Sequence, residues 1–197
     1  MTVNLDTRSI ESSAATEIYI SAVPTENVPP QEQAKEIFSR IRDTLRSKKA
    51  CILHERVFAT QSAMEIVSEI RSKTYSDIDD GVAPGFLAGV EGMLGPIAGV
   101  QVHAISSDSS PEVINLEGTA CGRILHVPGR TYLTLSQLSA THLAQPTKQA
   151  RAMLEKAESA LKQFGADFLA VPRTWMWLGD ILSWYGDFNR VRNDFFT

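Results

Sequence analysis

The chain has 197 residues, a formal net charge of −4, 43% hydrophobic residues and 21% charged residues. This composition is typical of a globular protein with one large or two small cores, and it excludes a disordered chain or a coiled coil. No apolar run approaches the roughly 20 residues of a membrane helix, and the N-terminus has no apolar signal-peptide core, so we expect a cytoplasmic protein without a membrane segment. The acidic balance disfavours a surface that binds nucleic acid.

In the first half, β-rich and helix-periodic segments alternate. Residues 1–14 show no clear pattern and predict a loose N-terminal tail. Pro29 and Pro30 mark the start of a helix, since proline is favoured in the first helical turn. In chain order the sequence predicts a strand at 18–23, a helix at 31–48, a strand at 50–59, a helix at 62–75 and a strand at 99–105.

An internal repeat then organises the chain. The apolar positions of the first predicted helix recur 116 residues later behind Pro146, and short β-rich runs with serine at Ser21 and Ser136 precede both helices. The polar stretch before Pro111 predicts a linker at 107–115. We therefore expect two tandem domains, at 15–106 and 116–197. The matched helix positions are Gln33, Ala34, Ile37, Phe38, Ile41 and Leu45 with Gln149, Ala150, Met153, Leu154, Ala157 and Leu161.

The second half is predicted to repeat the order of elements up to a point. After the helix at 147–164 we expect a strand at 166–178 with a β-bulge at Pro172, then a helix at 180–196 with Asp180 as its N-cap. The half has no counterpart of residues 76–106. Either the second domain is truncated at its C-terminus or it has diverged, and we favour truncation.

Few residues suggest metal or cofactor chemistry. Cys51 and Cys121 lack the spacing of a zinc or redox motif, and the four histidines stand singly. The glycines at 81–99 match neither of the two common phosphate-binding patterns, GxGxxG and GxxxxGK(S/T). No metal site and no cofactor are expected.

Arginines and aromatic residues gather near the C-terminus. Arg173, Arg190 and Arg192 are able to bind a carboxylate, and the alternative is that they form ion pairs with nearby aspartates. Trp175, Trp177 and Trp184 favour packing in a core or an interface over base stacking, because the acidic chain supplies no cationic groove. The nearby aspartates are Asp180, Asp187 and Asp194.

The segments at 18–22 and 173–196 resemble the Rid family (YjgF-like, endoribonuclease L-PSP), with Asn189 seven residues before the closing aromatic Phe196. The resemblance covers about residues 15–197 in tandem. It implies an α+β fold of two Rid/chorismate-mutase-like domains, each a mixed sheet with helices on one face. It also implies trimer-like homo-oligomers with small-molecule sites in their clefts, where active members hydrolyse enamines and imines.

The resemblance also identifies site residues. Ser136 and Asn189 match positions that line the family's cleft, and Arg173 is a further candidate for substrate binding. The arginine that binds the substrate carboxylate in the family aligns here with Gly92 or Met93, and His103 stands where a glutamate is usual. The first domain is therefore expected to be inactive as a deaminase, and the matching segment of the second domain would lie beyond Thr197.

Two classes of function follow. In the first class we expect the chain to bind or hydrolyse a small carboxylate metabolite in the manner of an imine deaminase. A chorismatase-like hydrolase is a related possibility. In the other class it is a non-catalytic scaffold or a ligand sensor with degenerate sites.

Overall fold

The computed structural model describes residues 3–26, 28–89 and 95–197 of an α+β protein. The chain packs as two compact units. Unit 1 contains residues 1–114 and 120–137, and unit 2 contains residues 115–119 and 138–197. These units are defined by packing, so the tandem domains predicted from the repeat, 15–106 and 116–197, stay a prediction. Among the described helices, none is both long and apolar enough to cross a membrane.

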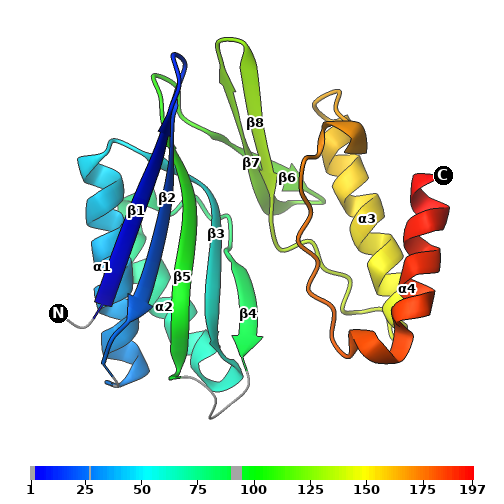
Figure 1. Cartoon of the computed structure of the whole chain (residues 1–197), viewed down its shortest axis with the longest axis horizontal. Helices are drawn as coiled ribbons and strands as arrows, with labels where there is room; N and C mark the ends of the chain where they lie inside the picture. The colour runs from blue at the N-terminus through cyan, green and yellow to red at the C-terminus, as the bar shows by residue number, and fades with distance from the viewer. Residues whose placement is uncertain (1–2, 27, 90–94) are drawn as a thin grey trace. The chain divides into compact units, whose positions relative to one another are not determined.

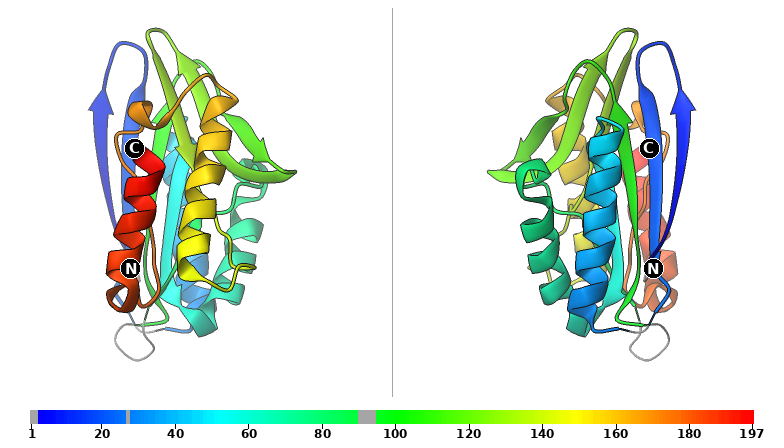
Figure 2. Two further views of the ribbon diagram at one scale, coloured as in Figure 1. Left: turned by 90° about the vertical axis from the view of Figure 1, so that its right-hand side faces the viewer. Right: turned by 90° about the vertical axis from the view of Figure 1, so that its left-hand side faces the viewer.

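Unit 1 is built on a five-stranded mixed sheet in the order β1-β2-β5-β3-β4. Only β3 and β4 run parallel. Strand β5 lies between β2 and β3, although it is the last of these five strands in the sequence. Helices α1 and α2 lie against one face of this sheet (Figure 1, Figure 2). The elements are β1 (Val3–Glu11), β2 (Thr16–Pro24), α1 (Pro30–Ser47), β3 (Cys51–Thr60), α2 (Met64–Tyr75), β4 (Gly85–Gly89) and β5 (Ile97–Ser106).

The core of unit 1 follows from the apolar spacing of α1. Ile37, Phe38 and Ile41 recur at helical spacing, and each is fully buried against the sheet. The Phe38 ring meets Tyr75 of α2 edge to face, with 5.4 Å between the ring centroids. The sheet supplies alternate residues of its central strands, such as Val100 and Val102 of β5, to the same core. The apolar face of α1 and the inward-facing residues of the strands therefore form one apolar layer.

A second, three-stranded sheet has the order β6-β7-β8. Its strands are β6 (Glu112–Leu116), β7 (Thr119–Val127) and β8 (Arg130–Leu135). Gly129 turns the β7–β8 hairpin with a φ of 75°, a conformation that glycine adopts without strain. Most of this hairpin belongs to unit 1, where the Thr134 hydroxyl donates to the Leu53 carbonyl at 2.6 Å.

Unit 2 is mainly helical. It contains α3 (Pro146–Lys162), a short 3₁₀ turn at Phe168–Ala170 and α4 (Ile181–Phe196), and the two long helices lie side by side. Between the turn and α4 the chain runs without regular structure (Figure 1). Trp184 has non-helical φ and ψ of −137° and 22°, so α4 is kinked near its start.

The helices start at similar separations along the two halves of the chain. Helix α1 begins at Pro30 and α3 at Pro146, 116 residues apart, while α2 begins at Met64 and α4 at Ile181, 117 residues apart. All four predicted helices are present.

Three sequence predictions were wrong at the level of single elements. Residues 3–11 are not a loose tail, because Val3 is buried and the segment pairs with β2 along its whole length. The predicted linker 107–115 contains the start of β6. The predicted strand at 166–178 is absent: within the described part of the chain no neighbouring strand pairs with it, so its β-rich composition has no ladder to join.

The predicted N-cap of α4 is also wrong in its chemistry. Asp180 does precede the helix, but its side chain makes no capping hydrogen bond and its backbone is left-handed, with a φ of 45°. An N-cap aspartate acts through an extended backbone that aims the carboxylate at the first free N–H groups. Asp180 lacks that conformation.

Candidate functional site

Unit 2 carries a cavity of about 410 Å³ that is open to the surface, between α3, the segment after the 3₁₀ turn and α4; half of its lining residues, Arg173 and Arg192 among them, are exposed. Its walls combine aromatic and aliphatic side chains with two arginines. The lining residues are Leu154, Phe168, Val171, Pro172, Arg173, Thr174, Met176, Phe188, Arg192 and Phe196.

Aromatic contacts position the apolar wall and the two cations. Phe168 meets Phe196 edge to face, with 5.1 Å between the ring centroids. The Arg173 guanidinium lies 5.7 Å from the centroid of the Trp175 ring, and that of Arg192 lies 5.6 Å from the centroid of Phe188. Cation–π contact holds a guanidinium without neutralising its charge, so both cations keep their attraction for an anion.

Neither cavity arginine is neutralised by a carboxylate among the residues that the structure describes. Arg190 pairs with Asp187, whereas no ion pair involves Arg173 or Arg192 in this part of the chain. The alternative of local ion pairs therefore holds for Arg190 alone. With two cations and no acidic lining residue, the cavity favours a negatively charged ligand.

The same lining supplies little chemistry for catalysis. No aspartate, glutamate, histidine, lysine or cysteine lines the cavity, and Thr174 carries its only hydroxyl. General acid–base catalysis needs a side chain that takes up or releases a proton near neutral pH. Among the lining residues, none belongs to the types that usually play this part.

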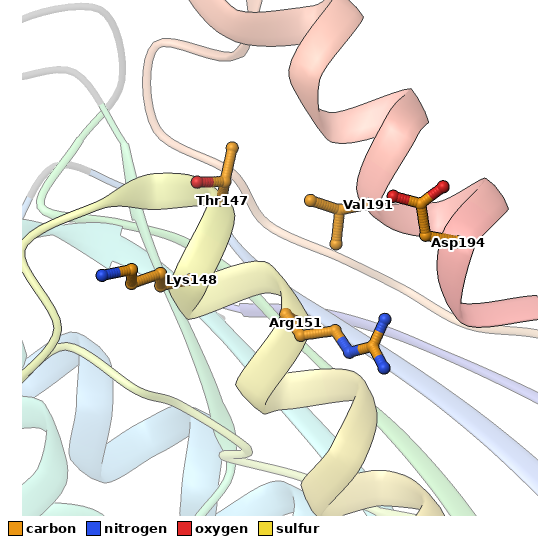
Figure 3. Close-up of a pocket in the computed structure, with 5 residues that line it drawn as sticks. All are labelled: Thr147, Lys148, Arg151, Val191 and Asp194. Atoms are coloured by element: carbon orange, nitrogen blue, oxygen red, sulfur yellow. The ribbon is translucent and has the colours of Figure 1, made fainter.

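A smaller cavity of about 300 Å³ lies near the start of α3 (Figure 3). Lys148 and Arg151 bring positive charge to it, and Asp194 brings a negative charge. Arg151 is also paired with Glu155 at 2.7 Å and lies over the Phe195 ring. Because its charges are mixed and partly paired, this cavity has no clear preference for an anion.

Unit 1 carries a polar cluster on the other face of its sheet from the helices. Glu17 of β2 accepts hydrogen bonds from the Tyr19 hydroxyl at 2.9 Å and the Tyr132 hydroxyl at 3.3 Å, and its carboxylate lies 2.9 Å from Nε2 of His103. The rings of Tyr19 and His103 stack, with 4.6 Å between their centroids. Arg130 Nη1 lies 3.7 Å from Glu17. The carboxylate is thus occupied by protein donors on several sides.

Burial lowers the pKa of two histidines on this face. His54 of β3 pairs in register with His103 of β5. Burial, assisted by the nearby Arg56, His103 and Arg123, lowers the pKa of His54 to about 4. Burial also lowers the pKa of His103, although its hydrogen bond with Glu17 opposes the shift. Desolvation disfavours the charged imidazole, which explains both directions.

The structure does not gather the predicted site residues into one cavity. Arg173 lines the large cavity of unit 2, whereas Asn189 lies on α4 but not in its lining. Ser136 belongs to unit 1, where its hydroxyl donates to the Ala83 carbonyl at 3.0 Å. Gly92 and Met93, the positions aligned with the family's arginine, lie outside the described residues. The proposed roles of Ser136, Asn189 and Arg173 stay predictions.

Sequence reasoning missed Glu17 completely. The alternation of Glu17 and Tyr19 on one face of β2 was the available signal. His103 lies far along the chain, however, and only the pairing of β2 with β5 brings it to the carboxylate.

Comparisons with known proteins give only distant likeness. No protein family and no curated protein matches the sequence. A chorismatase crystal structure is similar over 81% of this chain and 61% of its own, with 12% identity and a TM-score of 0.45. A candidate translation initiation inhibitor from Salmonella typhimurium is similar over 53% of this chain and 99% of its own, with 16% identity and a TM-score of 0.34. The chain thus spans less than two thirds of the chorismatase that it matches.

Proposed function

We propose that the chain is a Rid-like ligand-binding protein whose unit 2 cavity takes a small carboxylate with an apolar body. One observation carries the proposal: Arg173 and Arg192 line an aromatic cavity, and within the described chain no carboxylate pairs with either. The carboxylate of a bound ligand would form ion pairs with both guanidinium groups.

The dimensions and polarity of the cavity support this role. About 410 Å³ lies within the usual range of small-molecule sites, roughly 300–1,000 Å³. Guanidinium groups bind carboxylates through paired, charge-assisted hydrogen bonds. Phe168, Phe188 and Phe196 would pack on the apolar body of the ligand. The cavity would therefore prefer ligands that have both a negative charge and an apolar part.

Hydrolysis has less support than binding. The cavity lacks an acid–base side chain, and nothing observed favours a chorismatase-like reaction. Of the two classes of function, the non-catalytic ligand sensor therefore fits unit 2 better than an imine deaminase does.

The proposal is tested by titrating the protein with phenylacetate and its uncharged analogue phenylacetamide, following tryptophan fluorescence and heat. Trp175 lies against Arg173 and reports on that guanidinium. We expect phenylacetate to bind at least tenfold more tightly than phenylacetamide, and Arg173→Gln and Arg192→Gln each to remove that preference. Arg190→Gln is the matched control, since Arg190 is paired with Asp187 and does not line the cavity. Equal binding of acid and amide would overturn the proposal.

Self-association, expected in a trimer-like form, also stays a proposal. Trp177 is 55% exposed and Leu182 is 90% exposed, and exposed apolar side chains of this size favour a protein partner. Light scattering at micromolar concentration tests it, with a monomer as the contradicting result.

A further inference from the structure

Strand β1 forms one edge of the unit 1 sheet (Figure 1). It pairs with β2 from Val3 to Glu11 without a register shift, and no described strand lies on its other side. The strand contains neither proline nor lysine, two residue types that often protect the edges of sheets. At its first residue, the Val3 carbonyl accepts a hydrogen bond from Arg40 of α1. Beyond that residue, the edge is a template for an added strand.

Alternate residues of β1 direct their backbone groups away from β2. The N–H of Ser12 donates to the Ala15 carbonyl at 3.0 Å, which makes residues 12 and 15 a hydrogen-bonded pair of the β1–β2 hairpin. Hydrogen-bonded and non-hydrogen-bonded pairs alternate along an antiparallel ladder. Because the register is unbroken, the even-numbered residues of β1 bond to β2 and the odd-numbered residues point their N–H and C=O groups outward. The outward set is Val3, Leu5, Thr7, Ser9 and Glu11.

The strand also carries opposite charges on either side of its middle residue. Asp6 and Arg8 flank Thr7 on one face of β1, and their side chains are 58% and 79% exposed. If a second β1 runs antiparallel with Thr7 opposite Thr7, each Asp6 lies opposite the Arg8 of the other strand. The two Thr7 residues then exchange two hydrogen bonds, and the charged pairs occupy the closer, non-hydrogen-bonded positions. Opposite charges at such positions stabilise a sheet.

Neighbouring registers lack this complementarity. Shifting the second strand by two residues places either Arg8 opposite Arg8 or Asp6 opposite Asp6, and like charges in direct opposition destabilise a sheet. A shift by one residue opposes an outward-pointing residue with one that is bonded to β2, so the ladder cannot form. The register centred on Thr7 therefore satisfies both the backbone and the charges, and it uses the strand from Val3 to Glu11.

We propose that two copies of the chain associate through β1, antiparallel about Thr7, so that their unit 1 sheets join into one. The partner is a second copy because the strand is complementary to itself in hydrogen bonding and in charge. A contact of this kind uses the same surface on both copies and closes as a dimer. The proposal goes beyond carboxylate binding. It depends on unit 1, whereas the trimer-like association was argued from exposed side chains of unit 2.

Charge reversal tests the pairing, with sedimentation velocity on the full chain between about 10 μM and 1 mM. We expect a concentration-dependent dimer. Asp6→Arg and Arg8→Asp each place like charges opposite one another twice, so each should raise the Kd about tenfold or more. An equimolar mixture of the two variants restores both opposite-charge pairs and should dimerise like the natural chain. Circular dichroism checks that both variants are folded.

A cysteine at the centre of the strand locates the contact. In a Cys51→Ser background, which removes the exposed natural thiol, Thr7→Cys places two cysteines opposite each other, with Cα atoms about 5.5 Å apart and within reach of a disulfide. Ser9→Cys is the matched control on the same face, because its two copies would be separated by roughly 14 Å along the strands. We expect mild oxidation to cross-link the first variant and not the second.

Several results would overturn the proposal. A chain that stays monomeric at about 1 mM has no such contact. A dimer whose Kd is unchanged by both charge reversals, or a mixture of the variants that fails to associate, would contradict the register. Equal cross-linking of the two cysteine variants would indicate random collision. A trimer that persists in both charge variants would locate self-association on another surface.

Discussion

The guanidinium of Arg123 donates two hydrogen bonds to the carboxylate of Asp80, from Nε to Oδ2 at 2.6 Å and from Nη2 to Oδ1 at 2.6 Å. Arg123 is 3% exposed and also donates to the carbonyls of Leu53 and Val82, at 3.3 Å and 3.4 Å. One buried side chain of β7 thereby joins the β7–β8 hairpin to β3 and to the loop before β4. Paired, charge-assisted hydrogen bonds of this kind fix geometry as well as energy.

Replacing Arg123 with methionine is expected to lower the free energy of unfolding by about 2–4 kcal/mol. The substitution leaves Asp80 and two carbonyls without their donor, and Asp80 is exposed enough for water to compensate in part. Urea unfolding followed by circular dichroism measures the loss. Arg8→Met is the matched control, since the pair between Arg8 and Asp6 is exposed and contributes less than about 1 kcal/mol. Equal effects of the two variants would show that the Arg123 contacts contribute little.

A buried network between β3 and α2 gives a second prediction. The Tyr75 hydroxyl donates to Glu55 at 2.7 Å, and Arg71 holds the other oxygen of the same carboxylate at 2.6 Å. Tyr75→Phe should lower the free energy of unfolding by about 1–3 kcal/mol at pH 7, because a buried acceptor loses its donor.

The same network predicts a pH dependence at alkaline pH. Burial, followed by the charge of Glu55, raises the pKa of Tyr75 well above its usual value. The folded state therefore keeps its proton where the unfolded state releases it, and stability falls as the pH rises above about 10. Unfolding free energies at pH 8 and pH 10.5 should show a smaller loss in Tyr75→Phe than in the natural chain. An identical slope in both proteins would contradict this account.

His54 predicts the opposite dependence at acidic pH. Its folded-state pKa of about 4 is below the usual 6.5, so the unfolded state binds the extra proton between these values. Stability should be lost as the pH falls from 6.5 towards 4, by about 2 kcal/mol at pH 5. The measurement compares unfolding at pH 7.5 and pH 5 in the natural chain and in His54→Gln. A variant that loses as much stability as the natural chain would rule out His54 as the cause.

Gly122 is expected to tolerate no side chain. A Cβ at this position would lie 2.1 Å from the Thr134 carbonyl oxygen, in the adjacent strand of the hairpin. Gly122→Ala therefore forces β7 and β8 apart and should destabilise the protein by about 1–3 kcal/mol, the usual range for overpacking. Gly186→Ala is the control, because nothing lies within 4 Å of its Cβ and alanine favours the helix by about 1 kcal/mol. Thermal unfolding should move in opposite directions for the two variants.

Helices were the part of this fold that the sequence determined by itself. The apolar spacing that places Ile37, Phe38 and Ile41 on one face of α1 needs no knowledge of a partner, because helical hydrogen bonds close within the segment. The same holds for α3, α2 and α4. Strands of strong apolar character, such as β3, were also predictable from composition.

Strand pairing was decided by the tertiary structure alone. Residues 3–11 have a polar composition and form a strand because β2 supplies their hydrogen-bond partners. Residues 173–178 have a β-rich composition and form none, because no described strand lies beside them. A strand completes its hydrogen bonds only on a neighbour, and that neighbour is a non-local choice of the fold.

The candidate site divides in the same way. Arg173 was evident from the sequence as a cation among aromatic residues. Its relation to Arg192, which lies on a different element of the same cavity, and the meeting of Glu17 with His103 depend on how distant segments pack. The type of each residue can be read directly from the sequence. The distance between two side chains from different elements is fixed only when the chain has folded.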